Sequence, residues 1–330
     1  MRPRFVFDES SWAAAANAAP AGELNDAIEC LLERLEVART RDERVVKHRY
    51  CYDFDIGGGV RLEAFLFDQT CPVRQDYHFD HDVVFQFVQF LDRADDFDDS
   101  ELIDYDAEFN GESRFAPAVV WAHTSCRDRH HIAVLPLPLG DAPTGRVPVT
   151  VGDTTLAIFF VADESEHAAF FRSVVVLENA DEAKFQRLAG SAFPALDWAD
   201  NVWRGLRHFD RPYIEVRDEL VRCLGGLSDH GAACFHEFRS DPRQLARVLS
   251  VRAGKETSDE NGRTKRHSPS RRDRTRSHAG ANKVFWWHVK LRPDVDRVHF
   301  LYEPPPAGSI ELGKGRIVVG LFKDHCILPS

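Results

Sequence analysis

The stretch VFWWHVKLRPDVDRVHFLYE, residues 284–303, has the pattern of two β-strands joined by a turn. Side chains alternate between the faces of a strand, so Trp286, His288, Lys290 and Arg292 share one face of the first strand. The run GRIVVGLFK, residues 315–323, predicts a third strand. We expect one face of the resulting sheet to gather imidazole and cationic groups: His288, Lys290, Arg297, His299, Lys323 and His325.

Such a face suits chemistry on a polyanion without a metal. A histidine with a pKa near 6.5 can act as general base or general acid on a ribose hydroxyl or a leaving oxygen. Lysine and arginine stabilise the negative charge that builds on phosphorus, and Trp286 can stack on a base. The alternative interpretation is a polar sheet face whose imidazoles are satisfied by neighbouring groups.

Charge is distributed unevenly along the chain, whose net charge is −11. Residues 1–251 carry 26 Lys and Arg against 44 Asp and Glu, whereas residues 252–330 carry 16 against 9. A basic end is typical of contact with a polyanion, and a solvated surface is the alternative. Residues 252–282 predict a polar basic loop, or a polar helix around SRRDRTRSH, that orders on phosphates. The expected nucleic-acid-binding residues are Arg271, Arg272, Arg274, Arg276, Trp286 and Arg292.

Residues 1–235 have the pattern of an acidic α+β domain with a helical second half. FVFD at residues 5–8 predicts a strand, and residues 21–39 predict an amphipathic helix. Residues 48–56 and 60–68, separated by three glycines, predict a hairpin, and PAVVWAHTS at residues 117–125 predicts a strand.

Composition sets expectations for the compartment. The chain has no run of 18 apolar residues, so we expect no transmembrane helix. Its N-terminus lacks the pattern of a signal peptide. Seven scattered cysteines without a C-x-x-C pair are typical of free thiols in a reducing compartment, which predicts a cytoplasmic protein.

The segment HVKLRPDVDRVHFLY, followed by RIVVGLFKDH, resembles the C-terminal half of toxins of the RelE/HigB/ParE superfamily. The resemblance covers residues 237–330, and it implies a small basic domain of helices and an antiparallel sheet at residues 236–330. It also implies metal-independent cleavage of messenger RNA in the ribosome. By this resemblance His288 and Lys290 take the cationic positions of the first strand, Arg297 that of the second and Lys323 that of the third. Asp324 departs from the pattern, because the RNase members usually have an arginine there.

The sequence therefore predicts a toxin-like, metal-independent RNA endonuclease in a toxin or phage-defence setting, with the N-terminal domain as sensor or restraint. The expected partners are RNA, free or on the ribosome, and a protein partner or antitoxin at the acidic domain. No cofactor and no membrane contact are expected. The alternative is a non-catalytic adaptor or structural subunit that binds nucleic acid or protein through the same basic sheet.

Other patterns are weaker. The segments CRDRHH and HFDHD contain metal-ligand types without a recognised zinc spacing, so we expect polar loops and no metal there. These residues are Cys126, His130, His131, His78, Asp80, His81 and Asp82. The acidic run from Asp92 to Glu108 lacks the ligand order of an EF-hand and predicts an acidic surface, which could dock on the basic C-terminal domain. Motifs of P-loop ATPases, dehydrogenases, serine hydrolases and metzincins are absent.

Overall fold

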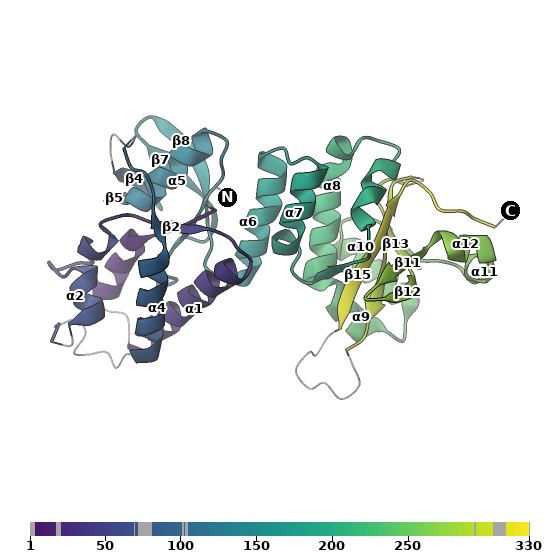
Figure 1. The fold of residues 1–330 in the computed structure, drawn as a ribbon, viewed down its shortest axis with the longest axis horizontal. Coiled ribbons are helices and arrows are strands. Elements are labelled where there is room, and N and C mark those ends of the chain that lie inside the picture. Colours follow the sequence, from purple (N-terminus) through teal and green to yellow (C-terminus); the bar gives the residue numbers. More distant parts are fainter. Residues whose placement is uncertain are drawn as a thin grey trace. The chain divides into compact units, whose positions relative to one another are not determined.

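The computed structural model of the chain, shown in Figure 1, is a mixture of helices and sheets, which is compatible with the expected α+β class. It divides into two compact units, which we call unit 1 (Met1–Phe170) and unit 2 (Phe171–Ser330). Among the described residues no helix is both long and apolar enough to span a bilayer. The residues that the structure describes are 4–17, 21–68, 70–71, 81–100, 102, 105–293, 295–305 and 315–329.

The described part of unit 1 is built on an eight-stranded mixed sheet with the order β3-β2-β1-β6-β8-β7-β4-β5. The strands from β3 to β8 in that order pair in parallel, and β7, β4 and β5 extend the sheet by antiparallel pairing. The strands are β1 (Phe5–Phe7), β2 (Val45–Lys47), β3 (Asp95–Asp96), β4 (Asp106–Phe109), β5 (Glu112–Phe115), β6 (Ala133–Leu135), β7 (Gly145–Val151) and β8 (Thr154–Phe160). Both β1 and β6 are apolar throughout and fully buried, because helices cover parallel strands on both faces.

Helices of unit 1 differ from the sequence prediction at two places. The strand predicted at residues 117–125 is wrong, because Pro117 occupies the first turn of a helix that packs on Val6 and Val134. The predicted hairpin at residues 48–68 is also wrong, since Leu62 and Phe65 are buried at helical spacing. The helices are η1 (Glu9–Asn17), α1 (Ala21–Thr40), η2 (Cys51–Asp53), α2 (Leu62–Phe67), α4 (His81–Arg93) and α5 (Pro117–Arg127), and α6 (Glu164–Leu177) contains the boundary between the units.

The described part of unit 2 holds a five-stranded sheet with the order β10-β13-β14-β15-β9. The three strands predicted at the end of the chain form its centre, and they pair antiparallel. The outer strand β9 pairs in parallel with β15, although it precedes the other strands in sequence by about 60 residues or more. The strands are β9 (Leu196–Trp198), β10 (Thr257–Asp259), β13 (Trp287–Lys290), β14 (Arg297–Glu303) and β15 (Arg316–Lys323).

The two faces of this sheet are covered by different elements. On the first, the helical face, Phe235 of α9 contacts Trp287 and Tyr302, and Trp203 of η3 contacts Phe322. On the second, the histidine face, lie α11, α12 and the β11–β12 hairpin. The elements are α7 (Glu182–Ala192), η3 (Val202–His208), α8 (Tyr213–Gly226), the π-helical turn η4 (Leu227–Gly231), α9 (Ala232–Phe238), α10 (Pro242–Arg252), α11 (Gly262–Arg266), α12 (Ser268–Asp273), β11 (Thr275–His278) and β12 (Ala281–Val284).

The division of the chain differs from the sequence prediction. The expected boundary at residues 235/236 falls inside α9, and β9 on its N-terminal side pairs with β15 on its C-terminal side. The segment 252–282, predicted as a basic loop or as a polar helix around SRRDRTRSH, is folded into short helices and strands, and α12 ends within SRRDRTRSH at Asp273. Asn261 caps α11 by accepting a hydrogen bond from the Thr264 backbone, and Pro269 lies in the first turn of α12. Local capping therefore orders a segment that has no apolar periodicity.

Candidate nucleic-acid interface

Pairing of β13 with β14 places His288 directly opposite His299, with the ring centres 5.2 Å apart. Lys290 is opposite Arg297, and Arg297 is in turn opposite Lys323. Directly opposed residues share a face, so five of the six residues expected to be catalytic lie on the histidine face. The sixth, His325, follows the end of β15.

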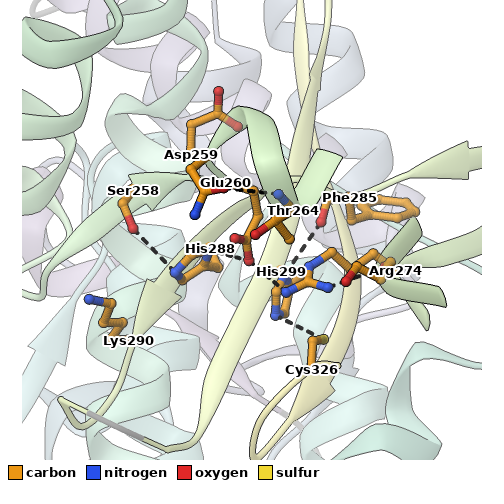
Figure 2. Close-up of polar contacts among 12 residues, drawn as sticks. Ser258, Asp259, Glu260, Thr264, Arg274, Phe285, His288, Lys290, His299 and Cys326 are labelled. Atoms are coloured by element: carbon orange, nitrogen blue, oxygen red, sulfur yellow. Dashed lines mark hydrogen bonds and ion pairs between the residues drawn. The ribbon is translucent and has the colours of Figure 1, made fainter. Parts of the chain in front are cut away.

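Both imidazoles are closed off from solvent. The exposed fraction is 4% for His288 and 0% for His299. His288 Nε2 lies 3.2 Å from the Ser258 hydroxyl of β10, and the Cys326 sulfur lies 3.4 Å from His299 Nε2. His299 Nδ1 is 3.3 Å from the Phe285 carbonyl oxygen. Because a carbonyl only accepts, the proton of neutral His299 belongs on Nδ1, and Nε2 accepts from the thiol. Figure 2 shows these contacts.

Burial also fixes the protonation state of the pair. It lowers the pKa of His288 to about 3, with a smaller contribution from the nearby cations Arg297 and Lys290. Burial lowers the pKa of His299 well below its usual range, and the neighbouring His288 and Arg274 add to this. Both rings are therefore neutral at pH 7, without the pKa near neutrality that suits a general acid or base.

Arg274, expected to bind nucleic acid, is instead a fully buried structural residue. Its Nη2 donates to Glu260 Oε1 at 2.7 Å, and its Nη1 donates to the Ile327 carbonyl at 3.0 Å. Glu260 Oε1 also lies 3.7 Å from His288 Nδ1. A buried guanidinium needs such a counter-charge, so Arg274 is held inside unit 2 in this structure, and its role in binding nucleic acid stays a prediction. The same ion pair joins the segment before α11 to the segment after α12.

The other expected cations have mixed surroundings. Lys290 pairs with Glu256, Arg292 with Asp210 and Asp296, and Lys323 with Asp273. Arg276 is half-buried and donates to the Asp273 and Thr275 carbonyls. Of the cations expected to be catalytic or to bind nucleic acid, Arg271 and Arg272 are exposed without an ion-pair partner among the described residues. The cationic face predicted from alternation is thus largely neutralised by carboxylates from neighbouring segments.

The weaker candidates lie in unit 1 or outside the described residues. Within the described ranges, no group of three or more His, Cys, Asp or Glu is arranged to hold a metal. His78 and Asp80 lie outside those ranges. In the acidic run, Asp95 pairs with Arg44 and Asp96 with Lys47, both from the neighbouring strand β2 or its start. That stretch is therefore partly neutralised within unit 1.

Unit 1 also buries two adjacent carboxyl groups, Asp8 and Glu9, where β1 ends. Asp8 accepts hydrogen bonds from the backbone and the hydroxyl of Ser10. Burial raises the pKa of Glu9 to about 8, and the neighbouring Asp8 adds to the shift. Glu9 therefore carries a proton at pH 7, which removes most of the cost of burying it.

A cavity of about 320 Å³, which we call the aromatic pocket, lies where β10, β13 and β14 meet α9 and α10 of the helical face and α11 and β12 of the histidine face. Phe235 stacks on Tyr302 with ring centres 4.9 Å apart, and its edge meets Trp287 at 5.2 Å. The volume lies within the range of small-ligand sites. The lining residues are Phe235, Arg239, Pro242, Leu245, Asp259, Lys265, Val284, Trp286, Trp287, Leu301 and Tyr302.

Exposed arginines lie at the rim of this pocket, where Arg239 follows the end of α9, and on α10. Arg239, Arg243 and Arg247 recur at intervals of four residues, and all three are exposed without an ion-pair partner among the described residues. Residues four apart lie on one side of a helix, so Arg243 and Arg247 project together. We call these three residues the arginine stripe. Sequence interpretation missed it, although the spacing R-x-x-x-R-x-x-x-R at residues 239–247 can be read from the sequence.

No family model, curated protein or solved structure matches the chain. The resemblance to the RelE/HigB/ParE toxins therefore stays a prediction. The site has to be interpreted from its own geometry.

Proposed function

We propose that unit 2 binds single-stranded RNA, with a base in the aromatic pocket and the adjoining phosphates on the arginine stripe. The observation that carries the proposal is the position of Arg239, which has no ion-pair partner among the residues that the structure describes. It lines the aromatic pocket at the end of α9, and the exposed Arg243 and Arg247 follow on α10. Aromatic platforms beside a cationic track are how proteins hold single strands, and an unpaired base offers its face to such a platform.

Charge around the pocket favours a nucleotide over an organic cation. Aromatic cages can bind ammonium groups, but here the lining carries Arg239 and Lys265 against the single carboxylate Asp259. A duplex would leave no free base for Trp286 and Trp287. The protein is therefore proposed as a nucleic-acid-binding adaptor, which is the second of the two functions predicted from the sequence.

Cleavage of RNA by the histidine face remains a prediction. His288 and His299 are buried and neutral, so an RNA phosphate could reach them only if the layer of α11 and α12 moved away. The roles predicted for the acidic N-terminal part, as sensor, restraint or contact for a protein partner, likewise remain predictions.

The test is binding of a fluorescent single-stranded RNA to the full chain, followed by anisotropy at low salt. Stacking on one aromatic ring contributes about 1–3 kcal/mol per base, so Trp286→Ala should weaken binding by roughly 5- to 150-fold. Arg187→Ala, on the exposed side of α7 and outside the pocket, is the matched surface control and should bind like the wild type.

A thermal melt of each variant separates lost binding from lost folding. Absence of binding by the wild type, or equal binding by wild type and a folded Trp286→Ala variant, would overturn the proposal. Gel analysis of the same RNA after incubation tests cleavage independently, since the adaptor function predicts intact RNA.

A further inference from the structure

Helix α10 has a buried side and an open side. Leu245 and Leu249, which lie four residues apart, are buried inside unit 2. The open side carries a depression of about 600 Å³, which we call the α10 groove. Its lining residues are Arg243, Gln244, Arg247, Val248, Val251 and Arg252.

The lining residues form two rows along the helix. Side chains four positions apart stack into a ridge, and neighbouring ridges leave a groove between them. The first ridge consists of Arg243, Arg247 and Val251, and the second of Gln244, Val248 and Arg252. A second helix packs by placing one of its own ridges into such a groove, so the shape fits an α-helix.

The chemistry of the α10 groove favours an acidic helix. Its three arginines are exposed without an ion-pair partner among the described residues, and its lining contains no carboxylate. Val248 is half-buried and Val251 is 76% exposed, so two aliphatic side chains lie among three positive charges. RNA phosphates would neutralise the arginines but would leave the valines in water. A helix with carboxylates and apolar side chains on one face satisfies both groups.

We propose that the α10 groove docks an acidic amphipathic helix of a partner protein, whose carboxylates pair with the arginines and whose apolar side chains cover Val248 and Val251. Arg243 and Arg247 also belong to the arginine stripe, so the partner helix and RNA exclude each other. The partner therefore regulates the protein by releasing its RNA. Only this competition rests on the proposed function, and the docking stands without it.

The experiment uses the full chain and two synthetic helical peptides of equal length and equal negative charge. The leucine peptide carries glutamates and leucines on one helical face, and the glutamine peptide has glutamine in place of each leucine. Binding of the fluorescent peptides is followed by anisotropy at low salt. We expect the leucine peptide to bind roughly 10-fold more tightly, because it removes the apolar surface of the valines from water.

Val251→Gln removes the more exposed aliphatic group and should lower the preference for the leucine peptide to about twofold or less. Ile214→Gln, at an exposed position of α8 outside the groove, is the matched control and should keep the preference. Thermal melts show whether each variant is folded. A preference that survives in folded Val251→Gln overturns the proposal.

Arg247→Glu places a carboxylate in the middle of the groove. It should weaken binding of the leucine peptide by about 10-fold or more, since like charges repel across an interface. Arg187→Glu, on the exposed side of α7, is the matched control and should bind the peptide like the wild type. Equal binding by the two folded variants would also overturn the proposal.

Competition separates the docking from the proposed function. Unlabelled leucine peptide should displace fluorescent uridine-rich RNA from the wild type. RNA binding without any binding of the leucine peptide overturns the docking and leaves the proposed function standing. Peptide binding without RNA binding supports the docking and overturns the RNA function. Simultaneous binding of peptide and RNA overturns the competition between them.

Discussion

The histidine face of the unit 2 sheet holds His288 and His299 beneath α11 and α12, whereas its helical face leaves Trp287 and Tyr302 at the wall of a cavity. Both faces are built by the same strands, β13 and β14. On the first, Arg274 meets Glu260, Lys290 meets Glu256 and Lys323 meets Asp273. On the second, Arg239 at the rim has no such partner among the described residues.

The difference shows that the residue composition of a sheet face does not determine whether that face is exposed to solvent. Histidines, arginines and lysines on one side of a strand indicate a polar layer, but the layer becomes a surface only where no other segment covers it. Aromatic residues normally indicate a core. Here Trp287 and Tyr302 are only half-buried and line the aromatic pocket.

Arg274 provides the most direct test of the difference between the two faces. Arg274→Ala leaves Glu260 buried without its counter-charge, and loss of one partner of a buried ion pair costs about 3–5 kcal/mol. The free energy of unfolding, measured by urea denaturation, should fall by that amount. Arg271→Ala, on exposed α12, is the matched arginine control and should change it by less than about 0.5 kcal/mol. Equal effects of the two changes would show that Arg274 is not buried as described.

The second test is the pH dependence of the histidine face. The folded-state pKa of His288, about 3, lies below its ordinary value of 6.5, so the unfolded chain takes up the proton first. The stabilisation from the neutral ring is complete above pH 6.5 and is lost as the pH falls toward 3. One such group changes the free energy of unfolding by about 1.4 kcal/mol per pH unit, or about 2 kcal/mol between pH 6.5 and 5.

His288→Gln removes this contribution, so the free energies of wild type and variant should converge as the pH falls. Taking the difference cancels other titrating groups, including Asp8 and Glu9 of unit 1. His236→Gln, at an exposed position of α9, should keep the slope of the wild type. Parallel curves for wild type and His288→Gln would mean that His288 is accessible to protons in the folded protein.

The smallest expected effect concerns the helical face. Each phosphate contact to a single strand contributes about 0.7 to the slope of log affinity against log salt concentration. Arg243→Ala should reduce that slope by about this amount. Binding titrations over a range of salt concentrations measure it, with Arg187→Ala as the matched control. An unchanged slope would show that Arg243 does not contact an RNA phosphate.

Much of the local structure follows from the sequence. Alternation in residues 284–303 and 315–323 predicted the three central strands and the shared face of His288 and His299, and helical spacing predicted α1. PAVVWAHTS was misinterpreted as a strand, because short apolar runs fit either structure until the position of Pro117 in a first turn is considered.

Coverage of the histidine face could not be predicted in the same way. The SRRDRTRSH segment has the composition of a solvated surface, and Arg271 and Arg272 are indeed exposed. Arg274 differs because Glu260 lies opposite it in space, and no sequence pattern encodes that pairing over 14 residues. The aromatic pocket was missed for a related reason, since it requires α9 and α10 to meet residues of β13 and β14 that lie about 50 residues further along the chain.

The inner position of β15, between β14 and β9, affects how the sheet of unit 2 folds during synthesis. Ribosomes release a chain from its N-terminus, so β9 and helices α7 to α10 emerge well before residues 316–323. Until then β9 has no neighbour in the sheet and β14 has one bare edge. Translation that stops before this strand would leave both edges open to pairing with other chains. We therefore expect the nascent protein to be most prone to edge-to-edge association, and most dependent on chaperones, before β15 is synthesised.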